Sequence, residues 1–258
     1  MNMIDPRFEN FRNFMFDLDG TIWKWTCLIP GAKKVVEELY ANGKTVHFIT
    51  NNTALSRAGF VAKLKGFGIR TTVDQIINPS VPAARILKGK RVFLLAEGIR
   101  KDLLSAGVKI TGSRPQAVLI GEDRTINYDK LVTATTAVNS GAHLYKTAAG
   151  GRWLMGDKQW PGTGAIAAAI EMATGRVAEL IGKPSRHMLQ DMRRIGYKAS
   201  ETVIIGDETL TDIEAGNLLG WKTALVLTGN SNGRDAILAH GYNKPQFVLS
   251  SVAELLKR

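Results

Sequence analysis

The chain has 258 residues, of which 45% are hydrophobic, and it carries a formal net charge of +11 at pH 7. This length allows one large domain or two ordinary ones, and no apolar run approaches the ~18 residues of a membrane-spanning helix. The polar N-terminus lacks the apolar centre of a signal peptide, and the single cysteine, Cys27, excludes an intrachain disulfide. We therefore expect a cytoplasmic protein with no membrane partner.

The positive charge is scattered along the chain. Short basic pairs such as Lys90-Arg91 and Arg193-Arg194 are typical of solvated surfaces, whereas a nucleic-acid-binding domain gathers its basic residues on one face. We expect no nucleic-acid partner, and an excess of positive charge that attracts small anionic substrates.

The first third of the chain alternates strand and helix. The apolar run Phe14 to Phe16 predicts a short buried strand, which Gly20 ends. A helix is predicted from Ala32 to Asn42, a strand over 44–49, and a helix that Ser56 caps and that stops near Gly66. Such a βαβ unit has a parallel sheet.

The middle of the chain, over 83–182, has the pattern of a separate α/β unit. Strands are predicted over 92–95 and 117–120, and helices over 127–139 and 165–172. On the helix over 127–139, the expected apolar side carries Tyr128, Leu131, Val132 and Val138.

The last third repeats the alternation of the first. Helices are predicted from Pro184 to Gly196 and from Thr211 to Leu219, and strands over 202–205 and 222–227. The economical interpretation is an α/β fold. A doubly wound parallel-sheet core is formed by residues 1–82 and 183–258, and an α/β domain over 83–182 is inserted into it.

Two acids, Asp17 and Asp19, stand where the chain leaves its first strand. Open α/β sheets bind ligands beyond the carboxyl ends of their strands. Two acids are costly there unless a cation or a reaction needs them. Mg²⁺ accepts such oxygen ligands, and one carboxylate could attack a phosphoryl group while the other handles the proton.

Three further segments carry polar residues after predicted strands or before helices. Together they would supply a cation site and donors for phosphoryl oxygens. Asp207 adds a further carboxylate to Asp17 and Asp19, and such a cluster of acids would repel itself without a cation. The residues are Thr50, Asn51 and Asn52; Lys183; and Asp207, Glu208 and Asp212.

In chain order, four segments resemble the motifs of the haloacid dehalogenase (HAD) superfamily: 17–21 (DLDGT), 49–52 (ITNN), 182–184 (GKP) and 206–212 (GDETLTD). The resemblance implies a HAD-like, Rossmannoid core and a nucleophile that forms an aspartyl-phosphate. The implied roles are Asp17 as nucleophile, Asp19 as general acid and base, Thr50, Asn51, Asn52 and Lys183 as phosphate binders, Asp17, Asp19 (through its backbone carbonyl) and Asp207 as Mg²⁺ ligands, and Asp212 as a support of the loop.

Further segments are similar to the NagD-like and 4-nitrophenyl phosphatases, whose large α/β (C2-type) cap lies between the second and third motifs. They are 29–32 (IPGA), 120–123 (IGED), 127–131 (NYDKL) and 161–164 (PGTG). The resemblance implies that 83–182 is a cap that selects the substrate. Such caps usually carry a Thr-Asn-x-Asp loop, which is replaced here by 147–153 (TAAGGRW). Trp153 and Trp160 are candidates for a leaving-group pocket in its place.

The prediction is a Mg²⁺-dependent phosphatase that hydrolyses a small phosphorylated metabolite. A phosphotransferase or phosphomutase of the same superfamily, and a receiver-like switch protein phosphorylated on aspartate, are the alternatives. The residues leave open the physiological substrate, the choice between Mg²⁺ and Mn²⁺, the effect of the altered cap loop, and the oligomeric state, for which a homodimer is one candidate.

Overall fold

The computed structural model describes residues 3–155 and 158–257, and the chain packs as two compact units. The first unit comprises Met1–Thr50, Val61–Ile77 and Leu189–Arg258, and the second comprises Asn51–Phe60 and Asn78–Met188. The units divide the chain at other residues than the predicted limits at 82 and 183. The assignment of 83–182 as a cap stays a prediction.

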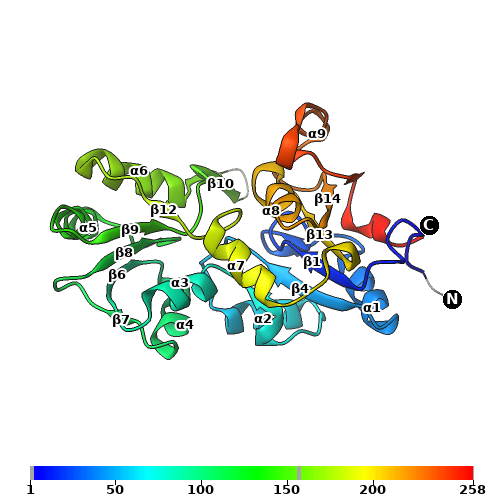
Figure 1. Ribbon diagram of the computed structural model, residues 1–258, viewed down its shortest axis with the longest axis horizontal. Coiled ribbons are helices and arrows are strands. Elements are labelled where there is room, and N and C mark those ends of the chain that lie inside the picture. The colour runs from blue at the N-terminus through cyan, green and yellow to red at the C-terminus, as the bar shows by residue number, and fades with distance from the viewer. Residues whose placement is uncertain (1–2, 156–157, 258) are drawn as a thin grey trace. The chain divides into compact units, whose positions relative to one another are not determined.

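The first unit is built on a parallel sheet, shown in Figure 1 by the strands labelled β1, β4, β13 and β14. The strand order is β15-β14-β13-β1-β4-β5, and every neighbouring pair is parallel. From β1 the chain goes outward to β4, and from β13 it goes the other way to β14, so the topological switch point lies between β1 and β13. The strands are β1 (Asn13–Phe16), β4 (Thr45–Ile49), β5 (Ile76–Ile77), β13 (Thr202–Gly206), β14 (Lys222–Val226) and β15 (Phe247–Leu249).

The helices predicted over 32–42, from Ser56 to Gly66 and over 184–196 are present close to their expected limits, whereas the sequence did not predict the helix over 233–238. The Ser56 hydroxyl accepts a hydrogen bond from the Gly59 N–H (3.1 Å), which confirms the predicted cap. The remaining elements of these segments are the small hairpin β2 (Trp23–Lys24) and β3 (Cys27–Leu28), with α1 (Ala32–Ala41), α2 (Arg57–Gly66), α7 (Arg186–Arg194), α8 (Glu214–Leu218) and α9 (Gly233–Leu238).

The predicted helix over 211–219 differs in its first turn. A π-helical turn, Thr209–Ile213, precedes α8. The N–H groups of Asp212 and Ile213 both donate to the Glu208 carbonyl (3.0 and 3.3 Å), and the Asp212 carboxylate accepts from the Glu208 N–H (3.1 Å). This side-chain bond favours a wider turn than the 3.6-residue period predicts.

The second unit has its own parallel sheet, in the order β12-β9-β8-β6-β7. Along β8, Ala117 and Leu119 pack with residues of α3 and α4, while Val118 and Ile120 pack with residues of α5 and α6, so helices cover both faces (Figure 1). The strands are β6 (Arg91–Leu95), β7 (Lys109–Ile110), β8 (Ala117–Ile120), β9 (His143–Lys146) and β12 (Glu179–Leu180), with a hairpin of β10 (Arg152–Met155) and β11 (Lys158–Pro161); the helices are α3 (Ser80–Leu87), α4 (Arg100–Ser105), α5 (Tyr128–Asn139) and α6 (Thr163–Thr174).

The apolar face predicted for α5 is partly wrong. Tyr128 and Val132 are exposed, at 80% and 50%, and the buried residues are Ala134, Ala137 and Val138. The helix turns its small alanines toward the core, where they pack with Ala167 and Ile170 of α6. Residue size rather than hydrophobicity decides which face approaches the neighbouring helix.

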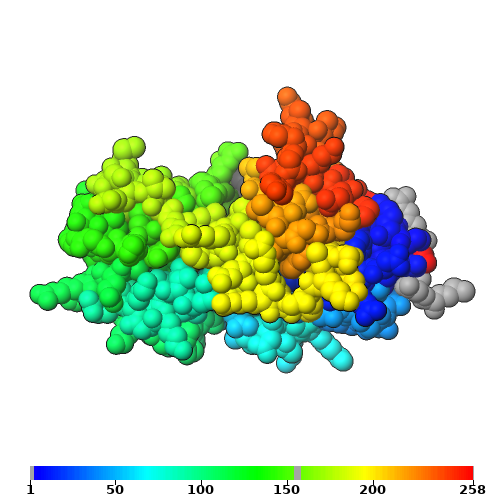
Figure 2. Space-filling view, viewed as in Figure 1, coloured from blue at the N-terminus to red at the C-terminus, as the bar shows by residue number. Residues whose placement is uncertain are grey.

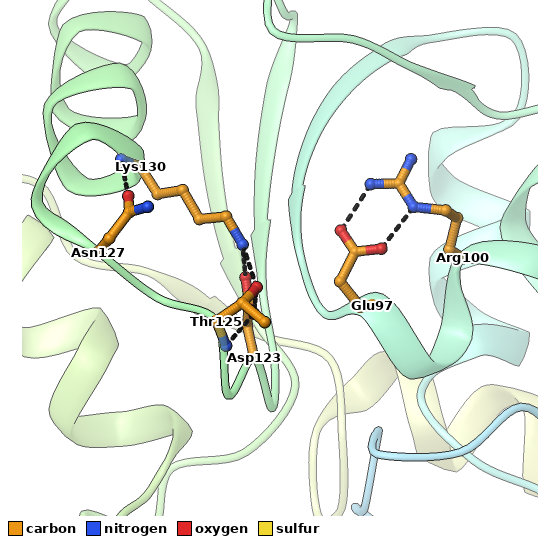
Figure 3. Close-up of polar contacts among 6 residues, drawn as sticks. All are labelled: Glu97, Arg100, Asp123, Thr125, Asn127 and Lys130. Carbon is orange, nitrogen blue, oxygen red and sulfur yellow. Dashed lines mark hydrogen bonds and ion pairs between the residues drawn. The ribbon is translucent and has the colours of Figure 1, made fainter.

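A polar network holds the chain between β8 and α5 (Figure 3). The Lys130 ammonium donates to the Asp123 carboxylate and to the Thr125 hydroxyl, both at 2.6 Å, and the Asn127 side chain caps α5 by accepting from the Lys130 N–H. Burial raises the pKa of Asp123, but the bonds from Lys130 and Thr125 outweigh burial and leave this pKa below its ordinary value. In the same figure, Arg100 and Glu97 form a separate two-bond pair.

No helix in residues 3–155 and 158–257 is long and apolar enough to cross a membrane.

Helix α9, the orange-red projection in Figure 2, has no buried residue and leaves Ile237 83% exposed. Its start is fixed by a capping box between Asn232 and Asp235.

A glycine in α8 sets how closely this helix packs on the sheet, and its replacement tests the packing. A Cβ at Gly216 would lie 2.3 Å from the Ile204 Cγ2 atom and 2.5 Å from the Thr223 Cγ2 atom. We expect Gly216→Ala to lower the free energy of unfolding by about 1–3 kcal/mol, because overpacking outweighs the better helix propensity of alanine. The matched control is Gly66→Ala in α2, where a Cβ meets no atom within 4 Å. Thermal and urea unfolding measure both variants, and equal stability of the two would contradict the packing described.

Candidate active site

The ends of β1 and β13 bring together acids that are far apart in the sequence. Phe16 pairs with Ile205, and the Asp17 N–H still donates to the Ile205 carbonyl (2.8 Å), so pairing continues one residue past β1. Asp17 and Asp207 are buried, at 7% and 3% exposure. The two carboxylates therefore lie side by side at the switch point of the sheet.

Asp212 joins this pair. Each of Asp17, Asp207 and Asp212 offers a carboxylate oxygen, and the three oxygens lie within 4.8 Å of one another. The π-helical turn after β13 carries Asp212 back to the strand end, where it is 1% exposed. The sequence placed Asp212 in a segment that would help to supply a cation site, and the family resemblance implied a support of the loop; the structure places its carboxylate in the acidic cluster itself.

The loop after β14 surrounds Asp207. The N–H groups of Asn230 and Ser231 donate to the Asp207 side chain (2.6 Å) and backbone carbonyl (2.9 Å). A Cβ at Gly229 would lie 1.9 Å from the Asp207 Oδ2 atom, and one at Gly20 would lie 2.5 Å from it. The Asp207 carboxylate thus occupies a cradle that only glycines leave open.

The acidic cluster fits a hard divalent cation. Its three donors are all carboxylate oxygens, the ligand type of Mg²⁺ and Ca²⁺ rather than of a soft metal. Buried carboxylates this close to one another repel strongly, and a cation removes the repulsion. The cradle around Asp207 fixes one of the three candidate ligands in place.

Asp19 is held apart from the acidic cluster. It is half-buried, and its Oδ1 atom accepts a hydrogen bond from the Trp23 indole N–H (2.7 Å). The Lys63 ammonium lies 4.0 Å from the centroid of the Trp23 ring. Burial lowers the pKa of Lys63 from its ordinary value, and the negative charge of Asp19 opposes this shift.

Thr50 lies at the end of β4, the neighbour of β1. It is buried, at 2% exposure, and its N–H donates to the Ile77 carbonyl (3.0 Å) at the end of β5. Its position at the carboxyl edge of the same sheet is the one that the prediction of a phosphate-binding residue requires. Phosphate binding by Thr50 stays a prediction.

The other predicted phosphate binders belong to the second unit. The Asn51 side chain accepts from the Lys183 N–H (2.6 Å) and donates to the Lys183 carbonyl (3.0 Å), so it clamps the backbone of a lysine that is 2% exposed. The Asn52 side chain accepts from the Ala54 N–H (2.8 Å), which closes a local turn. The binding of phosphate by these three residues stays a prediction.

The two tryptophans predicted at the cap face each other across the hairpin. Trp153 pairs with Trp160, and their ring centroids are 5.7 Å apart. The Arg124 guanidinium lies 5.2 and 5.4 Å from the two ring centroids, and its Nε donates to Glu122 (2.9 Å). The sequence reasoning missed Arg124 because it lies 29 positions before Trp153, and no local motif joins the two residues.

The replaced cap loop packs closely against the start of α6. The Gly162 and Gly164 N–H groups donate to the carbonyls of Gly151 and Gly150, each at 2.9 Å. A Cβ at Gly164 would lie 2.1 Å from the Ala149 carbonyl oxygen. The backbone of this loop therefore lies so close to the backbone at the start of α6 that only small residues fit there.

Two family models match the chain. The haloacid dehalogenase-like hydrolase model matches residues 14–109, and a second, HAD-hydrolase-like model matches residues 180–255. Together these matches include the segments that carry the acidic cluster, Asp19 and Lys183.

Curated relatives and solved structures are similar along nearly the whole chain. Phosphoglycolate phosphatase 2 of Arabidopsis thaliana is 32% identical, over 97% of this chain and 94% of that protein. A 4-nitrophenylphosphatase from Thermotoga maritima has a TM-score of 0.88 and 29% identity, over 96% of this chain and 97% of that one. A glycerol phosphate phosphatase from Mycobacterium tuberculosis, solved with magnesium, has a TM-score of 0.88 and 25% identity, over 96% of this chain and 77% of that one.

The chain belongs to the haloacid dehalogenase-like hydrolases. Within them it falls in the group of the NagD-like and 4-nitrophenyl phosphatases. The predicted family, the α/β fold class and the class of enzyme, a phosphoric monoester hydrolase, are confirmed, and use of a divalent metal is supported.

The cradle around Asp207 can be tested by a variant that leaves all three carboxylates in the chain. Gly229→Ala forces the Asp207 carboxylate away from its position, so we expect the Mg²⁺ concentration for half-maximal activity to rise at least about tenfold, ~1.4 kcal/mol of binding. Asp207→Ala should raise it further or abolish activity, and in both variants the rise in melting temperature on adding Mg²⁺ should shrink.

The control for this experiment is Gly233→Ala, at a glycine of α9 where a Cβ meets no atom within 4 Å. It should keep the wild-type Mg²⁺ dependence in both measurements. If Gly229→Ala also keeps it, the cradle does not position a metal ligand.

Proposed function

We propose that the protein is a Mg²⁺-dependent phosphatase that hydrolyses a small phosphomonoester through an aspartyl-phosphate. The observation that carries the proposal is the group of three buried carboxylate oxygens within 4.8 Å, at the switch point of a parallel sheet. One of these carboxylates, Asp17, begins the segment that resembles the nucleophile motif of the family. Membership of the HAD-like hydrolases argues against the receiver-like alternative.

The reaction has two balanced steps. In the first, an Asp17 oxygen attacks phosphorus and a new P–O bond forms while the ester P–O bond breaks; Asp19 gives its proton to the leaving alkoxide, which departs as the alcohol. In the second, Asp19 takes a proton from water, whose oxygen attacks phosphorus. The P–O bond to Asp17 breaks, inorganic phosphate is released, and the free carboxylate of Asp17 is restored.

The cation and the phosphate donors have separate tasks in this proposal. The carboxylates of Asp17, Asp207 and Asp212 would hold Mg²⁺ together with the backbone carbonyl of Asp19. When bound, the ion offsets the negative charge of the phosphoryl oxygens. Thr50, Asn51, Asn52 and Lys183 are the proposed donors to these oxygens, and the Asn51 clamp on the Lys183 backbone supports a fixed position for the lysine.

The substrate is proposed to be a small phosphorylated metabolite, of the kind named for the relatives, phosphoglycolate or glycerol phosphate. Residues 83–182 are proposed to act as a cap, with Trp153 and Trp160 as a wall for the leaving group and Arg124 across both rings. A cytoplasmic location and a homodimer stay predictions.

The nucleophile is tested by Asp17→Asn. An amide is a poor nucleophile but nearly isosteric with the carboxylate, so we expect turnover of 4-nitrophenyl phosphate to fall by more than about a thousandfold, ~4 kcal/mol in the barrier, while circular dichroism stays unchanged. Activity within about tenfold of wild type would rule out Asp17 as nucleophile.

The tryptophan pair is tested by Trp153→Ala and Trp160→Ala across a panel of phosphate esters that includes glycolate, glycerol, nucleotide, sugar and pyridoxal phosphates. We expect the ratio of kcat/KM values to change by about tenfold or more for at least one pair of esters, the equivalent of ~1.4 kcal/mol, and so to change the order of the esters. The Mg²⁺ requirement should stay unchanged. Tyr242→Ala, at an exposed aromatic residue of the first unit, is the control. An unchanged order in both tryptophan variants would make these rings packing residues only.

A further inference from the structure

The chain after Asp19 folds back on itself and carries a tryptophan to the acid. The Leu18 carbonyl accepts from the N–H groups of Ile22 (2.9 Å) and Trp23 (3.1 Å), and the Gly20 N–H donates to the Trp23 carbonyl (2.7 Å). This tight turn returns the indole ring to the residue four positions earlier. The Trp23 Nε1 atom then lies 2.7 Å from the Asp19 Oδ1 atom.

The indole ring is held on its other sides. Trp23 is fully buried, and its ring packs 5.9 Å from that of Phe67, centroid to centroid. The Lys63 ammonium lies 4.0 Å from the ring centroid and also donates to the Trp25 carbonyl (3.0 Å), which ties the lysine to the same loop. Packing against Phe67 and the Lys63 cation therefore hold the indole in addition to its bond to Asp19.

The bond has only one possible direction. An indole N–H can donate and cannot accept, so Asp19 Oδ1 is always the acceptor. When Asp19 is protonated, a proton on Oδ1 would point against the indole hydrogen. The carbonyl oxygen of a protonated carboxyl group is its better acceptor, so the indole favours the proton on Oδ2.

We infer that Trp23 is a positioning residue that directs the proton of Asp19 to Oδ2, from which the leaving alcohol receives it, and that Lys63 holds the indole in place for this task. The inference rests on the proposed function, because it assumes that Asp19 is the general acid. It adds two residues that no motif of the sequence pointed to.

The inference predicts a dependence on the leaving group. An alkoxide leaves only with a proton, so the hydrolysis of an alkyl phosphate depends on a correctly placed acid. The 4-nitrophenolate ion is stable without one, so the hydrolysis of its ester depends on the acid far less. A loss of packing alone would slow both esters alike.

The experiment compares glycerol 3-phosphate with 4-nitrophenyl phosphate in Trp23→Phe, which keeps an aromatic ring and removes the donor. We expect kcat/KM, which reports the step in which the leaving group departs and not the shared hydrolysis of the aspartyl-phosphate, to fall about 10- to 100-fold for glycerol 3-phosphate, part of the ~10²–10⁴-fold effect of a general acid, and less than about threefold for 4-nitrophenyl phosphate. Lys63→Met should give the same selective loss, smaller in size. Trp221→Phe, at another buried tryptophan of the first unit, should leave the ratio of the two kcat/KM values unchanged.

The outcomes separate this inference from the proposed function. If the wild type hydrolyses both esters and Trp23→Phe slows them equally or not at all, the positioning role is overturned and the phosphatase stands. If the wild type hydrolyses neither ester, the proposed function fails and the inference with it. Melting temperatures identify a Trp23→Phe protein that does not fold, and the ratio in Lys63→Met then decides: a selective loss supports the role, and an unchanged ratio overturns it.

Discussion

The mutual repulsion of three buried carboxylates is the constraint on which the rest of the first unit depends. Asp17, Asp207 and Asp212 each hold a carboxylate oxygen within 4.8 Å of the other two, and several local features bring them together. These are the π-helical turn that brings Asp212 back, the loop after β14, and the glycines on which Asp207 rests. A cation at this site would relieve the repulsion between the carboxylates and stabilise the folded chain.

The two acids of the first motif are given different surroundings although a single leucine separates them. The Asp17 carboxylate lies close to two other carboxylates, in a group that fits a cation. Asp19 instead accepts from the neutral indole of Trp23. A neutral donor is compatible with either protonation state of its acceptor, which is what a group that first gives and then takes a proton requires.

The sequence predicted the features that depend on strand periodicity and missed those that depend on loops. Apolar runs ending in acids located β1 and β13, and parallel strands end at one edge, so Asp17 and Asp207 could be placed together. Asp212 enters the cluster through a π-helical turn, which a 3.6-residue period does not predict. The contact of Trp23 with Asp19 depends on a turn stabilised by backbone bonds, and Lys63 reaches the ring from another element. On α5, the hydrophobic pattern predicted that Tyr128 and Val132 would be buried, but the face that packs closely against its neighbours carries alanines instead.

The altered loop of the second unit can be explained by packing before any substrate is considered. Gly150 and Gly151 accept from the first N–H groups of α6 and its cap, and the backbone approaches there so closely that a side chain on Gly164 would collide with the Ala149 carbonyl. This geometry accounts for small residues on both sides of the contact. Under the proposed function, polar recognition of the substrate falls to Arg124, which lies across Trp153 and Trp160 of the neighbouring hairpin. A guanidinium over two indoles keeps its charge while its position is fixed, so Arg124 and the hairpin would together offer a cation and an apolar wall, a pairing suited to an anionic ester with an organic leaving group.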